Sequence, residues 1–189
     1  SVTAEDRTSL ISIGGSISWA GKAGIGAGFA YVNNLGTLNA SVDGLGAADS
    51  KLRLYGDVTV SALNELSLIA VAATLSKAGG VAGLSFAGSL SLVNLDIDES
   101  ASVNNSFLDL HADNSASTSD VTVSATQDVF FVSTAGAAGI GGQASFGFAV
   151  AYTTYSGAAT ASVINSQLDD VNDLTLSAES TNDSYMVAF

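Results

Sequence analysis

The chain repeats one short segment, and this repeat constrains the fold more than any other feature of the sequence. Asp-Val-Thr-Val-Ser-Ala occupies residues 57–62 and returns at residues 120–125. A relaxed copy, Asp-Leu-Thr-Leu-Ser-Ala, occupies residues 173–178, and a remnant, Val-Thr-Ala, occupies residues 2–4. The ends of successive copies are 53 to 63 residues apart. A period of this length is typical of stacked supersecondary units and not of an enzyme built around one pocket.

Two further landmarks recur in the same order as the first. Ala-Ser-Val returns at residues 40–42, 101–103 and 161–163. A block rich in Gly and Ala precedes it each time, at residues 22–29, 77–86 and 138–146, and each block ends in phenylalanine. We therefore predict a single repeat array over residues 1–189, with approximate units at 1–56, 57–119 and 120–172 and the start of a fourth at 173–189.

Alternation with a period of two runs through most of the chain. Large apolar residues alternate with small residues over 10–19 and again over 146–152. This pattern predicts β-strands whose large side chains share one face. The sequence has no proline, which would interrupt a central strand. We predict an all-β fold, either a β-solenoid or a stacked β-sheet repeat array of about three units, with about three coils of roughly twenty residues in each period.

Charge is banded along the sequence. Acidic residues gather at 43–65, 96–128 and 169–183, and the stretch 129–155 has no charged residue. We expect the uncharged bands to form the wall of the core, with Trp19 and most of the tyrosines packed inside, and the acidic bands to lie in turns and on solvated strands. The uncharged stretch alternates as a strand does, so we predict no membrane insertion.

The formal net charge is −13, which follows from 5 basic and 18 acidic residues. Such a chain repels nucleic-acid phosphates and anionic membrane surfaces, so no nucleic-acid partner is predicted. The sequence has no cysteine, which excludes a disulfide framework and thiolate chemistry. Glu5, Asp6 and Arg7 fall where a secretory signal would need an apolar stretch, so no signal peptide is predicted within the sequence.

Catalytic motifs are weak in this sequence. His111 is the single histidine, and no serine or carboxylate pair is distinguished by its spacing. The glycine blocks lack the Lys-Ser/Thr of a phosphate-binding loop. We predict that the protein is not an enzyme. The alternative is a β-helical enzyme acting on polysaccharides, in which acidic residues converge in one groove beside a row of aromatic side chains.

Two acidic clusters are candidate calcium ligands, because calcium takes six to eight oxygen ligands. One cluster contains Asp96, Asp98 and Glu99, and the other contains Asp169, Asp170 and Asp173. Neither has the spacing of an EF-hand or of a calcium-loaded β-roll. We predict no cofactor, with a calcium-stabilised extracellular module as a further alternative.

The repeated Asp-Val-Thr-Val-Ser-Ala, Ala-Gly-Ile-Gly and Ala-Ser-Val segments resemble the repeat regions of large bacterial secreted exoproteins and filamentous adhesins, of the leukotoxin and filamentous-haemagglutinin type. The resemblance implies a cell-surface or extracellular β-solenoid rod that serves in attachment and has no catalytic residues. It leads us to expect a structural segment of an adhesin or extracellular filament. The expected partners are neighbouring repeats or identical subunits end to end, and host or matrix glycans or proteins.

Overall fold

The computed structural model describes residues 1–44, 52–110 and 119–189, and every regular element among them is a β-strand. Four long parallel strands form sheet A: β1 (Val2–Ala20), β4 (Val58–Ala78), β7 (Val121–Ile140) and β10 (Leu174–Ala188). Sheet B contains β2 (Ala23–Asp43), β5 (Leu84–Asn104) and β8 (Ala144–Ile164). A short sheet C contains β3 (Leu52–Arg53), β6 (Phe107–Asp109) and β9 (Gln167–Asp169). None of the described elements is a helix that could span a membrane.

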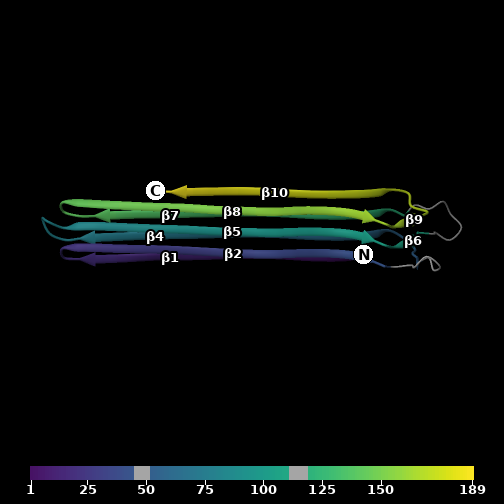
Figure 1. Ribbon diagram of the computed structural model, residues 1–189, viewed down its shortest axis with the longest axis horizontal. Coiled ribbons are helices and arrows are strands. Elements are labelled where there is room, and N and C mark those ends of the chain that lie inside the picture. Colours follow the sequence, from purple (N-terminus) through teal and green to yellow (C-terminus); the bar gives the residue numbers. More distant parts are fainter. Residues whose placement is uncertain (45–51, 111–118) are drawn as a thin grey trace.

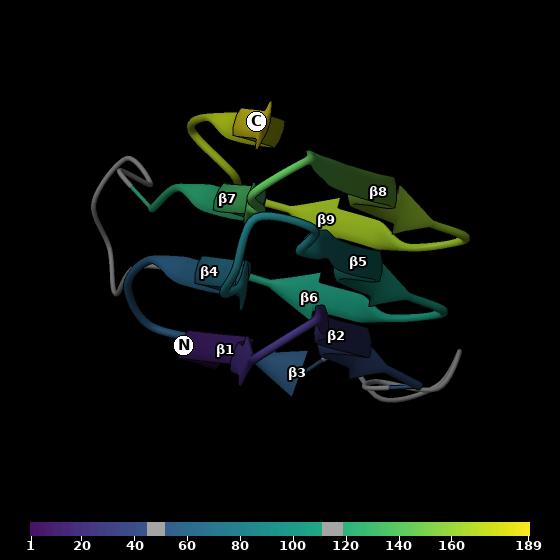
Figure 2. The same cartoon turned by 90° about the vertical axis from the view of Figure 1, so that its left-hand side faces the viewer.

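Each repeat makes one coil of a flattened β-solenoid (Figures 1 and 2). The chain runs along a sheet A strand, turns, runs back along a sheet B strand, and returns through a short sheet C strand. The prediction of an all-β solenoid is confirmed, but the prediction of three short coils in each period is wrong. The strands are 20 or 21 residues long in β4, β5, β7 and β8 because no proline or turn sequence interrupts the alternation.

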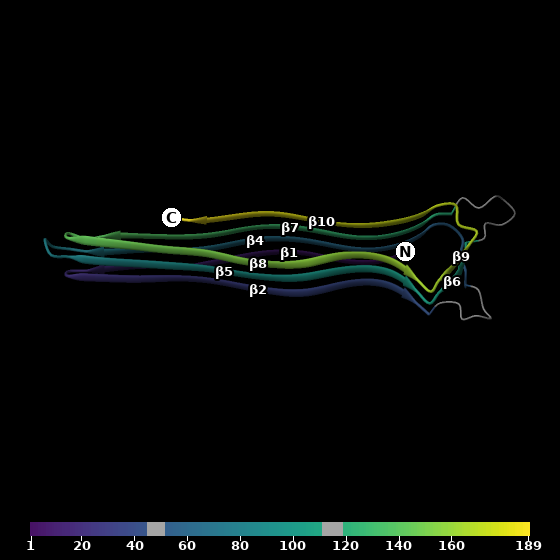
Figure 3. The ribbon, with the colours of Figure 1, turned by 45° about the horizontal axis from the view of Figure 1, so that its top comes forward.

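The coils stack in parallel and in register, and Figure 3 shows the long strands running side by side along the molecule. Ala4, Ala62, Ala125 and Ala178, which end the four copies of the first landmark, are neighbours along sheet A. The Ala-Ser-Val copies are aligned in the same way along sheet B. The repeated sequence therefore places like residues side by side in adjacent strands.

The final phenylalanines of the three glycine blocks do not all lie in one row of sheet B. Phe86 and Phe146 are aligned in neighbouring strands, but their neighbour in β2 is Ile25. Phe29 pairs instead with Leu90. The turns before sheet B also differ in length: β1 ends at Ala20 and β2 begins at Ala23, whereas the later turns are longer. Turns of different length can therefore join strands whose backbone pairing stays in register.

The interior between the sheets is built differently at its two ends. The loop-side half, next to sheet C, is filled by large apolar side chains in two clusters. Leu68, Leu95 and Val123 are fully buried there. The turn-side half, next to the turns that join sheet A to sheet B, is filled by Gly, Ala, Ser and Thr. Its inward residues include Gly14, Gly28, Ala72, Thr74, Ser85, Ser91 and Ser133.

The two sheets approach very closely in the turn-side half. A Cβ atom added to Gly28 would lie 2.6 Å from Thr74 Oγ1 and 2.9 Å from the Ala73 carbonyl oxygen. A Cβ atom on Gly14 would collide with the backbone carbonyl of Phe29. Small inward residues are therefore a steric requirement of this half.

This close approach corrects one sequence prediction. In the turn-side half the uncharged bands line the interior with their small residues, while their large residues point outwards. Trp19 is 75% exposed, and Tyr31 and Tyr152 are each more than half exposed. The large side chains do not fit between backbones that are nearly in contact, so in this half the large residues of the alternating pattern face outwards and the small ones face inwards.

Candidate interaction surface

The outer surface of sheet A in the turn-side half, which we call face A, carries rows of apolar side chains. Parallel in-register pairing places Ile11, Ile69 and Val132 in one row, and Ile13, Val71 and Thr134 in the next. Two rows further on lie Ile17, Leu75 and Ala138, followed by Trp19, Lys77 and Ile140. The side chains of Ile11, Ile13 and Ile17 are 67 to 80% exposed. Contiguous exposure of this kind makes face A a candidate interaction surface.

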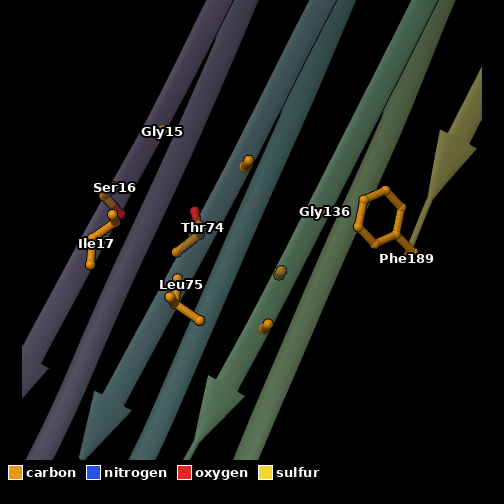
Figure 4. Close-up of a pocket in the computed structure, with 10 residues that line it drawn as sticks. Gly15, Ser16, Ile17, Thr74, Leu75, Gly136 and Phe189 are labelled. Carbon is orange, nitrogen blue, oxygen red and sulfur yellow. The ribbon is translucent and has the colours of Figure 1, made fainter.

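A groove crosses face A between two of these rows. Its floor is Gly15, Ala73 and Gly136, and its wall on the turn side contains Ile17 and Leu75. The groove has a volume of about 710 Å³ and an almost wholly apolar lining. Figure 4 shows it crossing three strands, with the ring of Phe189 at the Gly136 end. A Cβ atom on Gly136 would lie 2.7 Å from that ring, so glycine is what lets an aromatic side chain lie there.

A second, smaller hollow of about 310 Å³ lies where face A meets the acidic band. Ser9 and Ser67 form its small floor, and Arg7, Glu65, Asp128 and Phe130 surround it. Arg7 Nε lies 3.4 Å from Glu65 Oε2. Glu65 and Asp128 are aligned in neighbouring strands, so this row is net negative. Face A therefore runs from an acidic edge to a basic residue, Lys77, near the turns.

The outer surface of sheet B, face B, is aromatic in its turn-side half. Phe86 and Phe146 stack with ring centroids 5.3 Å apart, and Phe29 and Tyr31 stack at 6.3 Å. Strands β2, β5 and β8 contain no Lys or Arg. Their outward carboxylates lie beyond the aromatic rows, with Asp96 and Asp98 on β5 and Asp43 at the end of β2. Among the described residues, no two carboxylates face each other across a groove lined by aromatic side chains, which is the arrangement that the polysaccharide-enzyme alternative requires.

The first predicted calcium cluster is divided between two surfaces of sheet B. Asp96 and Asp98 point outwards from β5, whereas Glu99 points inwards and is only 1% exposed. Adjacent residues of a strand face opposite sides, so Glu99 cannot share an ion with its neighbours across the sheet.

The second predicted cluster lies at the end of the molecule that carries sheet C. Asp169 belongs to β9 and accepts a hydrogen bond from Gln167 Nε2 at 3.0 Å. Asp170 follows it with a φ of 58°. Asp173 precedes β10, and its Oδ2 lies 3.4 Å from Asn172 Nδ2. No group of three or more acidic or histidine side chains suited to a metal occurs in the described parts of the chain. Calcium binding stays an untested alternative, and His111 lies outside the described residues.

Glu99 belongs to a buried polar layer that the sequence analysis did not identify. Its Oε1 accepts a hydrogen bond from Asn64 Nδ2 at 2.7 Å, while Oε2 has no partner among the described atoms. Burial raises the pKa of the Glu99 carboxyl, the hydrogen bond from Asn64 and the nearby amide of Gln127 oppose that rise, and the charge of Asp98 adds to it. The parity of the strand was the available signal, because Glu99 alternates in step with Ile97 and Ala101.

Gln127 completes this layer between the two apolar clusters. Its Nε2 donates to the Ile97 carbonyl oxygen at 2.7 Å, and its Oε1 accepts from the Tyr155 hydroxyl at 2.7 Å and from Ser180 Oγ at 2.6 Å. These bonds join β7 to β5, β8 and β10. Hydrogen bonds of this kind help to fix the register between the two sheets.

Comparisons with protein-family models, curated proteins and solved structures give no match to this chain. Function is therefore argued from the geometry of the solenoid and of its surfaces.

Proposed function

We propose that the chain is a non-catalytic structural repeat segment of a bacterial cell-surface adhesin or extracellular filament, which presents an elongated acidic surface for attachment or self-assembly. One observation carries the proposal: the described coils stack in parallel and in register, so that a further coil can pair with the outermost strands. β1 and β2 edge one end, and β8 and β10 edge the other. An open edge offers unpaired backbone groups to another strand.

β10 supports the idea that this stack accepts further coils. It continues the ladder of β7 in register from Leu174 to Ala188, but no described sheet B strand faces it. Leu174 and Leu176, which continue the repeat, are 47% and 49% exposed as a result. Another coil placed on this end, from a neighbouring repeat or an identical subunit, would cover the exposed strand. Such head-to-tail contacts do not close on themselves and generate filaments.

The proposed mechanism is spacing and presentation. Each added coil lengthens the stack by about 4.8 Å, so a repeated segment extends a surface without any moving part. The acidic bands keep such an array soluble. The exposed aromatic rows of face B are available to host or matrix glycans or proteins along its length.

Electron microscopy and fibre diffraction of the purified chain test self-assembly. We expect rods whose length increases with protein concentration and which give a meridional reflection near 4.8 Å. Particles that keep the size of a single chain at every protein concentration would contradict end-to-end assembly. The location is tested by antibody labelling of intact source cells, where surface labelling is expected and labelling only after permeabilisation would contradict it.

A further inference from the structure

We propose that face A binds face A of a second copy of this chain, with the strands of the two copies antiparallel and a two-fold axis passing across Ile13, Val71 and Thr134. This lateral contact uses a surface that end-to-end stacking leaves free, so it goes beyond the function proposed above. In the described parts of the chain no element packs over face A.

The first argument is the shape of face A. The two-fold axis runs along the row of Ile13, Val71 and Thr134. A row of one copy that lies a given number of rows before the axis therefore faces the row of the second copy that lies the same number of rows after it. Ile11 and Ile69 of one copy then meet Gly15 and Ala73 of the other, which form the open part of the groove. Large side chains therefore meet small ones on both sides of the axis.

The smaller hollow shows the same complementarity. The same axis places Ile17 opposite Ser9 and Leu75 opposite Ser67, at the floor of that hollow. On β7 it places Phe130 opposite Ala138. The groove already holds one apolar side chain, since the Phe189 ring lies against Gly136. That contact shows the kind of group that the groove accepts.

The second argument is charge. The antiparallel arrangement brings Lys77 of one copy opposite Glu65 of the other, and Trp19 opposite Arg7. It also directs the two acidic loop-side halves away from each other, which a parallel arrangement of two chains of charge −13 does not. Lys77 Nζ already lies 4.4 Å from the centroid of the Trp19 ring, so the cation is held on this face.

Among axes that lie along a row, this one pairs Lys77 with Glu65 on β4, although on β7 it places Asp128 opposite Ile140. Moving it by one row towards the turns places Ile69 opposite Lys77, and moving it one row the other way places Glu65 opposite Ala73. Either shift buries a charge against an apolar group. Face B offers no equivalent, because strands β2, β5 and β8 contain no basic residue to oppose Asp96 and Asp98.

The third argument is the available area. Eight apolar side chains of face A are 38 to 80% exposed: Ile11, Ile13, Ile17, Trp19, Leu75, Phe130, Ile140 and Tyr185. At about 100 Å² each they offer about 800 Å² per copy, which is the size of a standard stable interface. A lipid surface is the less favoured occupant, because the edges of β1 and β10 would be costly in hydrocarbon.

A charge-swap experiment tests the register of this contact. Sedimentation of the full chain over a range of concentrations should show a dimer. Lys77→Glu and Glu65→Lys should each weaken dimerisation by about tenfold or more, and the double variant should restore it, because the pair then forms with exchanged signs. Lys22→Glu is the matched control, since Lys22 lies in the β1–β2 turn and not on face A. Failure of the double variant to recover would overturn the proposed register.

Chemical cross-linking tests the face itself, even if a charge variant fails to fold. The chain has no cysteine, so Ile13→Cys creates a single thiol at the two-fold axis. A bis-maleimide that spans about 10 Å, the distance between packed sheets, should join two copies. Ile25→Cys on face B is a matched control, because Ile13 and Ile25 are 76% and 73% exposed. The proposal would be overturned if the Ile13→Cys chain stayed monomeric or if both variants were cross-linked equally. It would also be overturned if the chain cosedimented with phosphatidylcholine vesicles and did not dimerise.

Discussion

Large and small residues alternate in both halves of the solenoid, but the loop-side half buries the large residues and the turn-side half buries the small ones. In the loop-side half the large residues point inwards, as Leu68 and Leu95 do. In the turn-side half the small residues point inwards and Ile13, Trp19 and Phe148 point to the outside. Alternation therefore shows which residues share a face, and the space between the sheets decides which face is inside.

The difference has a cause in the local sequence. A strand keeps its parity along its whole length, so the side that faces the interior cannot change within it. In β4 the inward residues are large up to Leu68 and then become Ala70, Ala72 and Thr74. The outward residues become large over the same stretch, with Ile69, Val71 and Leu75. The interior thins as the surface becomes apolar, and this is what creates face A.

The largest expected effect comes from truncating the loop-side core. Leu68→Ala should lower the free energy of unfolding by about 2–5 kcal/mol, because the side chain is fully buried and leaves a cavity. Chemical denaturation measures the change. Leu75→Ala is the control on the same strand, and it should cost about 1 kcal/mol or less because Leu75 points outwards. Equal losses would remove the distinction between the two halves.

The next effect probes the close approach of the sheets in the turn-side half. Gly28→Ala should lower the free energy of unfolding by about 1–3 kcal/mol, because the new methyl group meets Thr74 and the Ala73 carbonyl. Gly88→Ala should leave it unchanged or raise it by about 0.4–1 kcal/mol, since a Cβ atom there meets nothing within 4 Å. If Gly28→Ala is tolerated as well as Gly88→Ala, the small residues are not a steric requirement.

A smaller effect concerns pH and the polar layer within the loop-side half. Because burial raises the folded-state pKa of Glu99, the folded protein binds this proton more tightly than the unfolded chain does. The contribution of Glu99 to the free energy of unfolding therefore falls as the pH rises from 4.5, the ordinary pKa of this carboxyl, through the raised pKa. Above the raised pKa this contribution no longer changes with pH. Glu99→Gln should remove this decline, with denaturation measured from about pH 4 to about pH 8.

Asp98→Asn is the control for the pH experiment. It removes a neighbouring charge on the outer surface of β5 but keeps the buried carboxyl, so the decline should persist. A Glu99→Gln chain that keeps the full decline would show that other carboxyls cause it.

The smallest effect is expected on the apolar surface. Ile25→Thr should change the free energy of unfolding by no more than about 0.5 kcal/mol, because Ile25 is 73% exposed and threonine keeps the β-branch. Thermal unfolding of both chains at the same low concentration measures this. A loss as large as that of a core truncation would mean that another element or subunit covers face B.

Much of the fold could be predicted from the repeated segments. Their order predicted stacked coils, and the in-register neighbours Ala62 and Ala125 are the residues at which two copies end. The candidate surface could not be predicted in this way. The sequence analysis placed Trp19 and the tyrosines inside, because large apolar residues usually are buried. It also grouped Glu99 with Asp96 and Asp98 by proximity, although strand parity separates them.

The sequence by itself determined the β-strands, their parallel register and the banding of charge, because these depend on local alternation and on the similarity of successive repeats. Only the tertiary structure decided that one repeat makes one coil and that Ile13 lies outside while Gly14 lies inside. That choice depends on the distance between two sheets that are not neighbours in sequence. The steric limit set by the backbone at Phe29 is what turns the apolar residues of the turn-side half outwards.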